Sequence, residues 1–460
     1  MTIPIITDLV ETAKFALIEG VNGWIAEKAA EARRNNKGIV ETALLGKTTF
    51  VLTTPNALRS VFYDESRCHR KDAMVVTSKI LTGGNSEDVV TEMDDAKHAT
   101  RKAILNNVGA ENIIDFNLQH VWAPHLDKWI ESIVARIDSS AAQSVKLNFY
   151  PELEEVIWTA GLRLALGLVS VSDSLLAHIK AWKKGYISLP ADIPFTAFHY
   201  AVQGRDAIYA VIREQLVLHR QHPEKYENTL MQILLLHQNS SMSDDALVHE
   251  SLHFFEAITG IPMVIANTLI GLKQSDPVHS AALYSELNST AAQEFLAKPT
   301  TATVKNLPIL SRTVKEALRR YVVLPFRLGT AVEQTEFEGV MINKGDTLMA
   351  ALWTVNQDPD VYESPEKFYP DRWAGNEFGL LGPSKNQHPN GLYEFVAFGG
   401  TTREQRQCAG STTAFTILRF AVAKVLAALD VQVAHDQELE WKQNLVVPVG
   451  GMPCVVRKRD

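Results

Sequence analysis

Apolar residues recur with helical spacing over most of this 460-residue chain, and this periodicity limits the possible folds more than any other feature. Apolar residues three and four positions apart predict amphipathic helices that pack around a shared core. The pattern covers residues 113–138, 151–168, 203–219, 243–273, 280–296, 308–321 and 410–429. We therefore expect a mainly α-helical protein.

Short β signals lie on both sides of this helical region. Residues 44–53 read LLGKTTFVLT, and Pro55 follows them as a helix start. Further strands are expected at 326–332, 338–343, 346–350 and 445–456, the last with a turn at Gly450-Gly451. The predicted fold class is mainly α with a minor β region.

The length alone leaves the number of domains open, because 460 residues would make about three average domains. However, no internal repeat and no long linker rich in Gly, Ser or Pro divides the chain. We predict one domain over residues 1–460, with residues 1–40 as a helical lead-in.

Composition narrows the functional classes and the compartment. The net charge of −8 gives no global attraction to nucleic acid. The longest uncharged apolar run, Ala257 to Leu272, is short for a membrane span and contains Pro262, so we expect a buried helix. Asp8 and Glu11 interrupt any export signal, and three cysteines cannot form a disulfide framework. These features predict a cytoplasmic protein without nucleic-acid or membrane partners.

A long stretch punctuated by Pro and Gly, residues 357–407, precedes the last helical pattern. Irregular connections of this length are usually functional. It ends in FVAFGG, from Phe395 to Gly400, a polar loop, and RQCAG around Cys408. Glycines let the backbone approach a flat group closely, and a helix start favours a thiolate. Cys408 is therefore a candidate metal ligand, although a buried structural cysteine before a helix would show the same pattern.

Two further elements precede this cysteine. Glu316 and Arg319 stand three positions apart on one helix face and can pair, although such pairs are common on surfaces, where they add little stability. The segment PEKFYPDRW, residues 365–373, contributes Arg372. We expect Arg372 to join Glu316 and Arg319 in a buried ion network that fixes the irregular stretch.

The order of these elements resembles the cytochrome P-450 superfamily of heme-thiolate enzymes. An E-x-x-R helix, a PExFxPxRW element and a glycine-preceded C-x-G loop follow one another as in that superfamily. Within it, the chain is most similar to the bacterial peroxygenase branch, which uses hydrogen peroxide to hydroxylate or decarboxylate fatty acids. That likeness extends to LLGKTTFVLTTPNALRSVFYD, RCHRKDAM and VTEMDDAKHATRKAI, and to the long spacing from Phe395 to Cys408.

The resemblance implies a single-domain cytochrome P-450 fold that binds heme b. Cys408 would be the iron ligand, held as a thiolate that favours O–O cleavage. Gly399 and Gly400 would let the backbone approach the heme closely, as the glycines of that superfamily's loop do. The heme carboxylates need cations, and the bases at matching positions, each of which could instead be an ordinary surface base, are Arg406, Lys102, His98 and Arg70.

The helix over 243–273 should pass over the distal face of the heme. Oxygen-activating members carry an acid and an alcohol there, and fatty-acid peroxygenases carry Arg-Pro, whereas this chain has Ile261 and Pro262. Without the arginine, a buried fatty-acid carboxylate would be uncompensated at a cost of roughly 3–5 kcal/mol, or about a hundredfold or more in affinity. Either the substrate is not a simple fatty acid or its anion is anchored elsewhere; our hypothesis is the former, a less anionic or more aromatic molecule.

Helical spacing indicates which residues line the distal pocket. Phe254, Ala257, Ile258 and Ile261 share the heme-facing stripe, and the resemblance adds Thr91 to the pocket. A proline inside a helix costs about 3 kcal/mol, which favours a special site at Pro262 over plain core packing. Glu256 is turned off the stripe but is a candidate for the missing acid–base group, which unchanged turnover of a Glu256→Gln variant would exclude.

These features favour a peroxygenase-like oxidoreductase that oxidises a small apolar or aromatic molecule with hydrogen peroxide. The first alternative is a monooxygenase fed by ferredoxin and a reductase, with a docking patch of Lys97, Arg101, Lys102 and Arg403. The second is a heme isomerase, dehydratase or lyase that opens a preformed O–O or N–O bond. A heme-binding sensor or carrier would not need the large apolar pocket.

Overall fold

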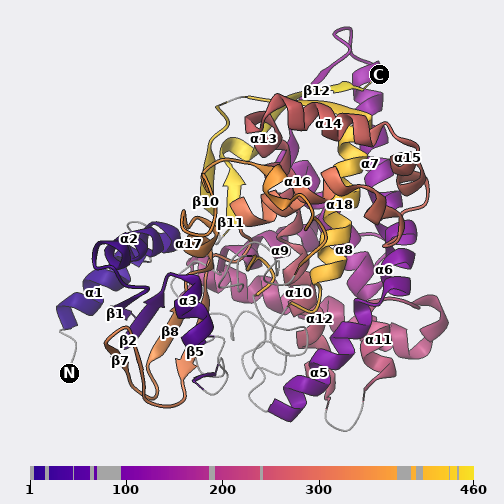
Figure 1. The fold of residues 1–460 in the computed structure, drawn as a ribbon. Coiled ribbons are helices and arrows are strands. Elements are labelled where there is room, and N and C mark those ends of the chain that lie inside the picture. Colours follow the sequence, from indigo (N-terminus) through magenta and orange to yellow (C-terminus); the bar gives the residue numbers. More distant parts are fainter. Residues whose placement is uncertain are drawn as a thin grey trace.

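The computed structural model describes residues 5–15, 20–44, 46–62, 67–69, 95–185, 192–238, 242–380, 395–399, 408–434, 436–442 and 445–459. Figure 1 shows a large helical lobe beside a smaller sheet lobe that contains the N-terminal helices. The predicted class, mainly α with a minor β region, is confirmed.

The helical lobe contains every helix from α5 onward except α17. Its members up to α11 are α5 (Asp95–Val108), α6 (Glu111–Asn117), α7 (Ala123–Asp138), α8 (Phe149–Leu166), α9 (Asp173–Lys184), α10 (Ala197–Gln221) and α11 (Leu230–Leu236). The others are α12 (Asp244–Ile258), α13 (Ile261–Gln274), α14 (Pro277–Leu287), α15 (Thr290–Ala297), α16 (Pro308–Arg320) and α18 (Ser411–Ala428). Short helical turns are η3 (Leu118–Trp122), η5 (Pro223–Lys225), η6 (Thr303–Asn306) and η7 (Pro370–Trp373).

The sheet lobe is built on a five-stranded sheet with the order β1-β2-β8-β5-β3. Its strands are β1 (Ile39–Leu44), β2 (Lys47–Leu52), β3 (Cys68–His69), β5 (Arg327–Ala331) and β8 (Thr347–Ala350). Among the strands that the structure describes in this sheet, β2 and β8 pair in parallel, with Thr49 opposite Thr347, and the other pairs are antiparallel. Beside the sheet lie α3 (Pro55–Ala57), η2 (Leu58–Phe62), α17 (Leu352–Asn356) and the hairpin of β6 (Thr335–Phe337) and β7 (Val340–Ile342).

The remaining strands form a small sheet at one end of the helical lobe and a separate hairpin (Figure 1). One sheet has the order β4-β12-β9, with β4 (Val145–Asn148), β9 (Leu429–Val433) and β12 (Pro453–Lys458). The hairpin of β10 (Leu439–Lys442) and β11 (Leu445–Pro448) lies next to α13. The predicted turn is η8 (Val449–Gly451), where Gly450 and Gly451 have φ angles of 68° and 79°. Such left-handed backbone favours glycine.

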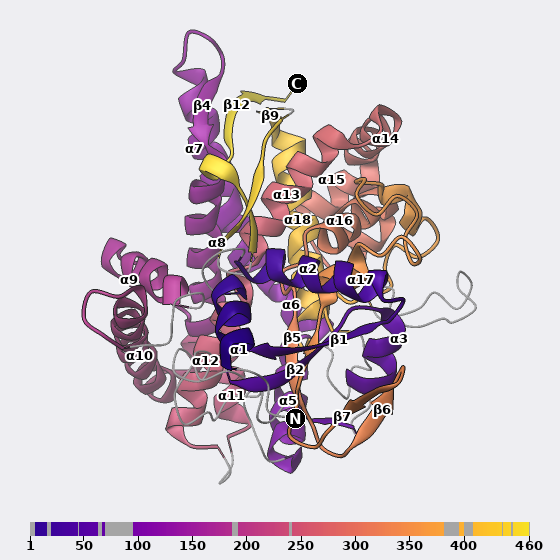
Figure 2. The same cartoon turned by 90° about the vertical axis from the view of Figure 1, so that its left-hand side faces the viewer.

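The N-terminal lead-in consists of α1 (Ile5–Ala13) and α2 (Gly20–Arg34), which pack on the sheet lobe (Figure 2). Glu11 ties the two helices together because it accepts a hydrogen bond of 2.6 Å from Trp24 Nε1 and lies 3.0 Å from Lys28 Nζ. The Asp8 carboxylate accepts a hydrogen bond from the Gly46 amide in the β1–β2 turn. This segment is therefore part of the packed structure.

Two buried apolar clusters hold the helical lobe together. The first core is formed mainly by α7, α8, α13, α16 and α18, with Trp122, Phe149 and Phe415 among its fully buried side chains. The second core joins α5 and α8–α12 and contains Trp158 and Trp182. Because α8 contributes to both, the helical lobe is one continuous unit.

The predicted helix at 243–273 is broken into α12 and α13 at Thr259-Gly260. Pro262 lies in the first turn of α13, where its missing N–H would have no helical partner in any case. Our estimate of a proline penalty inside a helix was therefore wrong, because Pro262 begins a helix. The pattern at 280–296 is likewise two helices, because the Ser289 hydroxyl caps α15 by accepting from the Ala292 amide.

Within the described part of the chain, two helical segments are long and apolar enough to cross a membrane. Residues 244–274 and helix α18 have apolar windows that are 83% and 72% buried inside the protein. Burial of this extent is expected for core helices that pack against other helices.

Candidate active site

Cys408 lies directly before α18, with its main chain fixed on both sides. Its amide donates a 2.8 Å hydrogen bond to the Phe398 carbonyl, and its own carbonyl accepts from the Ser411 amide at 3.2 Å. The residue is half-buried and its thiol is free of any disulfide. The thiol is thus presented at the N-terminal end of α18 on a fixed backbone.

The backbone turn at Gly399 lies against a charged side chain, the guanidinium of Arg327. The Gly399 φ of +85° and a hydrogen bond of 2.9 Å from its amide to the Val396 carbonyl form a tight turn. A Cβ on Gly399 would lie 2.5 Å from Nη1 of Arg327, so the guanidinium packs directly against this backbone. Sequence reasoning missed Arg327, although a lone basic residue in the predicted strand at 326–332 was a usable signal.

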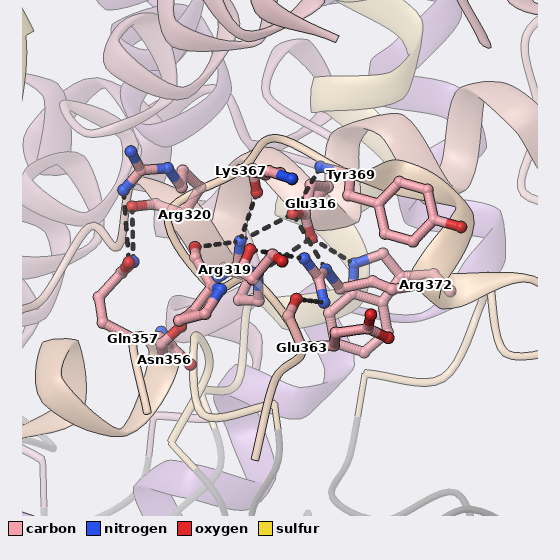
Figure 3. Close-up of polar contacts among 12 residues, drawn as sticks. Glu316, Arg319, Arg320, Asn356, Gln357, Glu363, Lys367, Tyr369 and Arg372 are labelled. Atoms are coloured by element: carbon pink, nitrogen blue, oxygen red, sulfur yellow. Dashed lines mark hydrogen bonds and ion pairs between the residues drawn. The ribbon is translucent and has the colours of Figure 1, made fainter. Parts of the chain in front are cut away.

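Glu316, Arg319 and Arg372 come together in a buried ion network (Figure 3). The carboxylate of Glu316 accepts hydrogen bonds from Arg319 at 2.7 and 3.0 Å and from Arg372 Nε at 3.2 Å. It also accepts from the Tyr369 amide at 3.0 Å and from Trp373 Nε1 at 2.9 Å. Glu316 and Arg319 are both fully buried, and this close pairing compensates for the desolvation of their charges.

The two arginines of this network also fix the irregular segment around residues 356–372. Arg319 donates to the main-chain carbonyls of Asn356, Pro365 and Lys367. Arg372 donates to the carbonyl of Glu363 at 2.9 Å. The arginines thus provide hydrogen-bond partners for loop carbonyls that have none within a helix or strand. These hydrogen bonds hold the irregular segment in one conformation.

A row of aromatic rings connects the ion network with the cysteine loop. Trp373 meets Phe395 edge to face at 5.5 Å, and Phe395 meets Phe398 at 6.2 Å. Lys315 Nζ lies over the Trp373 and Phe395 rings at 4.3 and 5.2 Å from their centroids. Because the Phe398 carbonyl holds the Cys408 amide, the network supports the position of the thiol.

Helix α5 directs basic side chains inward. His98, Arg101 and Lys102 lie on one face of this helix; His98 is half-buried, and Arg101 and Lys102 are 4% and 8% exposed. Arg101 and Lys102 therefore cannot belong to a docking patch for an electron-transfer protein, because their side chains are inside the molecule. Buried cations require anionic or hydrogen-bonding partners, which suits a role beside carboxylates.

The expected pocket residues of α12 differ in their exposure. Ala257 is exposed and Phe254 is half-buried, whereas Ile258 packs in the first core and lies within contact distance of Gly161 on α8. Ile261 is 5% exposed at the start of α13. Ile258 is thus a helix-packing residue, and Phe254 and Ala257 are the members of the stripe with accessible surface.

Polar groups near the α12–α13 break are few among the described residues. The Thr259 hydroxyl donates a 2.7 Å hydrogen bond to the Glu256 carbonyl. The Glu256 carboxylate lies 3.4 Å from Nδ1 of His253, one turn earlier on α12. Sequence reasoning missed His253. The predicted residues Thr91, Arg70, Gly400 and Arg406 lie outside the described residues.

The family model for cytochrome P450 matches residues 17–452 of this chain. The chain belongs to the cytochrome P450 family. It is 22% identical over 406 residues to putative cytochrome P450 120 from Synechocystis sp., covering 87% of this chain and 85% of that protein. It is 20% identical over 430 residues to abscisic acid 8'-hydroxylase 1 from Arabidopsis thaliana, covering 92% and 84%.

Solved structures show the same fold. Retinoic acid-bound cyanobacterial CYP120A1 superposes with a TM-score of 0.80 at 21% identity, covering 98% of this chain and 96% of that one. Cytochrome P450SP alpha (CYP152B1) in complex with (R)-ibuprophen superposes with a TM-score of 0.73 at 17% identity, covering 99% and 98%. The expected cytochrome P-450 fold is confirmed as one domain that covers the chain.

This cytochrome P450 is a heme-thiolate oxidoreductase that binds heme b and acts on a small molecule. The described residues fit that cofactor. Cys408 offers a half-buried thiol on a fixed backbone, and a side chain at Gly399 would be excluded by φ and by Arg327. Basic side chains of the kind that two carboxylates need occur on one face of α5 and at Arg327, and Ala257 on α12 is exposed.

Proposed function

We propose that this cytochrome P450 is of the peroxygenase type and uses hydrogen peroxide to oxidise a small apolar or aromatic molecule, by hydroxylation or a related reaction. The observation that carries the proposal is the set of residues at the α12–α13 break. Ile261 and Pro262 have no proton to give, and the Thr259 hydroxyl is committed to the Glu256 carbonyl. We further propose that it works in the cytoplasm without an electron-transfer partner.

The physical reason lies in the balance of protons and electrons. Dioxygen must receive two electrons and two protons before its O–O bond can open with loss of water, and a distal acid or alcohol delivers those protons. Hydrogen peroxide already contains both electrons and both protons. A distal wall without a proton relay therefore suits peroxide better than dioxygen.

In this proposal, each described residue has a limited task. Cys408 holds the iron, and Lys102, His98 and Arg327 hold the heme carboxylates. Phe254 and Ala257 form an apolar wall that excludes water and orients the substrate. Heme iron with a thiolate ligand supplies O–O cleavage and oxygen transfer.

The test is turnover of the heme-loaded protein with hydrogen peroxide alone. The first compounds are phenylcyclohexane, a neutral molecule, and two carboxylic acids bound to related structures, ibuprofen and myristic acid. We expect products, detected by mass spectrometry, from phenylcyclohexane and little from either acid. Turnover only with NAD(P)H, ferredoxin and a reductase would overturn the proposal, and an isomerised product formed without any oxidant would indicate the isomerase or lyase alternative.

A further inference from the structure

Helix α12 carries one small accessible area in the middle of the fold. Beyond its first turn, the residues with accessible surface are His253, Phe254, Glu256 and Ala257, and the side chains before and between them are buried. Phe254 and Ala257 are apolar. His253 and Glu256 are therefore the polar groups of this area.

The accessible area belongs to the part of the helical lobe where both cores are present. Phe254 packs against the first core and against the second. Ala397 and Phe398 of the cysteine loop pack against the first core, and Ala409 packs against the second. The stripe on α12 and the loop around Cys408 thus pack against the same two cores, and the proposed function, in which α12 is the distal helix, puts the reaction between them.

We propose that His253 and Glu256 form a recognition pair for a neutral hydroxyl group on an otherwise apolar substrate. This inference rests on the proposed function, whose substrate class it makes more specific. His253 is the substrate-binding residue. Glu256 is a positioning residue, because its carboxylate lies 3.4 Å from Nδ1 of His253 and fixes the imidazole ring.

The charges of the pair favour a neutral group over an anion. Side chains of His253 and Glu256 are only 24% and 30% exposed, so charge interactions there are less screened than at a surface. A substrate carboxylate would approach the like charge of Glu256. A hydrocarbon would cover the pair without replacing its bonds to water, which is unfavourable. A hydroxyl both donates and accepts, and therefore suits an imidazole–carboxylate pair in either protonation state.

Neighbouring polar groups on the same helices do not offer this contact. The Thr259 hydroxyl is used by the Glu256 carbonyl. Glu250 and Ser251 are each 1% exposed and belong to the buried part of α12. The His253–Glu256 pair is therefore the recognition element that the described part of the distal helix provides.

The experiment compares two ligands that differ only in the hydroxyl, 4-phenylcyclohexanol and phenylcyclohexane. Dissociation constants for the heme-loaded protein are measured by the change in the heme absorption spectrum and, independently, by calorimetry. The quantity of interest is the ratio of the two constants, because it cancels the contribution of the shared apolar skeleton.

Replacing the pair should change this ratio in a graded way. His253→Phe keeps a ring and removes the hydrogen bond, so the hydroxyl compound should lose about tenfold in affinity relative to the hydrocarbon. His253→Asn keeps a donor and an acceptor and should restore part of the loss. Glu256→Gln should cost about threefold, because the imidazole stays but is less well oriented.

An exposed pair of the same kind provides the control. His222 and Glu224 lie 3.9 Å apart at η5, and His222→Phe and Glu224→Gln should leave the ratio unchanged. The inference is overturned if His253→Phe weakens both ligands equally or neither, with the circular dichroism and the heme spectrum intact. Binding needs no peroxide, so the two proposals can fail separately. If the ratio changes in His253→Phe but the wild type shows no turnover with peroxide, the proposed function is refuted and the recognition pair is supported.

Discussion

At the scale of single residues, the surroundings of the three cysteines decide which of them can serve as the iron ligand. Cys68 is buried in strand β3, and burial raises the pKa of the Cys454 thiol to about 12. Cys408 is half-buried next to the start of α18. The thiolate form is therefore disfavoured at Cys454, whereas Cys408 presents a partly accessible thiol free of any disulfide.

We predict that Cys408→Ser abolishes the thiolate signature of the heme, whereas Cys68→Ser and Cys454→Ser retain it. The signature is the Soret band of the reduced, carbon monoxide-bound protein, because a thiolate and a neutral ligand give different band positions. A Cys408→Ser protein with an unchanged Soret band would refute the assignment.

Glu316 is the residue whose loss should cost most stability. Its two carboxylate oxygens accept from two arginines, the Trp373 indole and the Tyr369 amide. In Glu316→Gln an amide NH₂ replaces one of these acceptors and leaves Arg319 as an uncompensated buried charge. We expect a loss of roughly 3–5 kcal/mol in the free energy of unfolding, measured by urea denaturation.

Glu294 supplies the matched control for that measurement. It is exposed on α15, so Glu294→Gln should change the free energy of unfolding by less than about 0.5 kcal/mol. If Glu316→Gln were no more destabilising than Glu294→Gln, the ion network would not be a stabilising element.

Ile261 should control the proposed preference against fatty acids. The resemblance to the fatty-acid peroxygenases places an arginine at this position, and Ile261→Arg would supply a guanidinium for a carboxylate. We expect myristic acid to bind about a hundredfold more tightly to this variant, measured by optical titration. Ile261→Met, which stays apolar, is the control, and equal affinities of the two variants would contradict the prediction.

At the scale of elements, α9 and α10 pack so closely that a glycine is required between them. A Cβ on Gly204 would lie 2.5 Å from the His178 carbonyl oxygen and 3.1 Å from the Trp182 amide nitrogen. Helix propensity alone would make Gly204→Ala stabilising by about 1 kcal/mol. The contact is with backbone, which cannot rotate away, so we expect the variant to be destabilised by about 1–3 kcal/mol instead.

Urea denaturation of Gly204→Ala and of Ala210→Gly separates the two effects. Ala210 is exposed on the same helix, and its replacement should cost about 1 kcal/mol through propensity alone. A Gly204→Ala protein more stable than the wild type would show that α9 can move away from α10.

Helix positions followed from the sequence far better than helix ends did. The periodic patterns at 151–168, 308–321 and 410–429 coincide with α8, α16 and α18 to within a few residues. The pattern at 243–273 hid the break at Thr259-Gly260, because apolar spacing continues across it and reports burial rather than hydrogen bonding. A proline is compatible with either a kinked helix or a new first turn, and only the backbone decides between them.

At the scale of the whole molecule, the site is assembled from segments that are far apart in the chain. Glu316, Arg372 and Cys408 could be recognised from the sequence because each belongs to a short motif. The three motifs follow one another in a characteristic order along the chain. Arg327 and His253 belong to no motif. Arg327 stands out as the lone basic residue of its predicted strand, but nothing local in the sequence shows that this strand lies beside the cysteine loop. Likewise, no local signal shows which part of the interior His253 on α12 borders.

Acid should destabilise the whole molecule through three histidines, of which His219 and His279 are buried and His125 is half-buried. Burial lowers the pKa of His125, His219 and His279 from the ordinary 6.5. Below that value the unfolded chain takes up protons on these rings more readily than the folded protein does. The free energy of unfolding is therefore fully maintained above about pH 6.5 and decreases as the pH falls below it.

The sensitivity to acid can be assigned to single rings by urea denaturation over a series of pH values. His219 is fully buried, and its ring lies between the Gln215 carbonyl at 2.8 Å and the Thr229 hydroxyl at 3.1 Å. His219→Gln keeps a polar group there but takes up no proton, so the loss of stability below about pH 6.5 should become less steep than in the wild type. The exposed His120, replaced by Gln, should leave the slope as it is. Equal slopes for the wild type and His219→Gln would place the acid sensitivity elsewhere in the molecule.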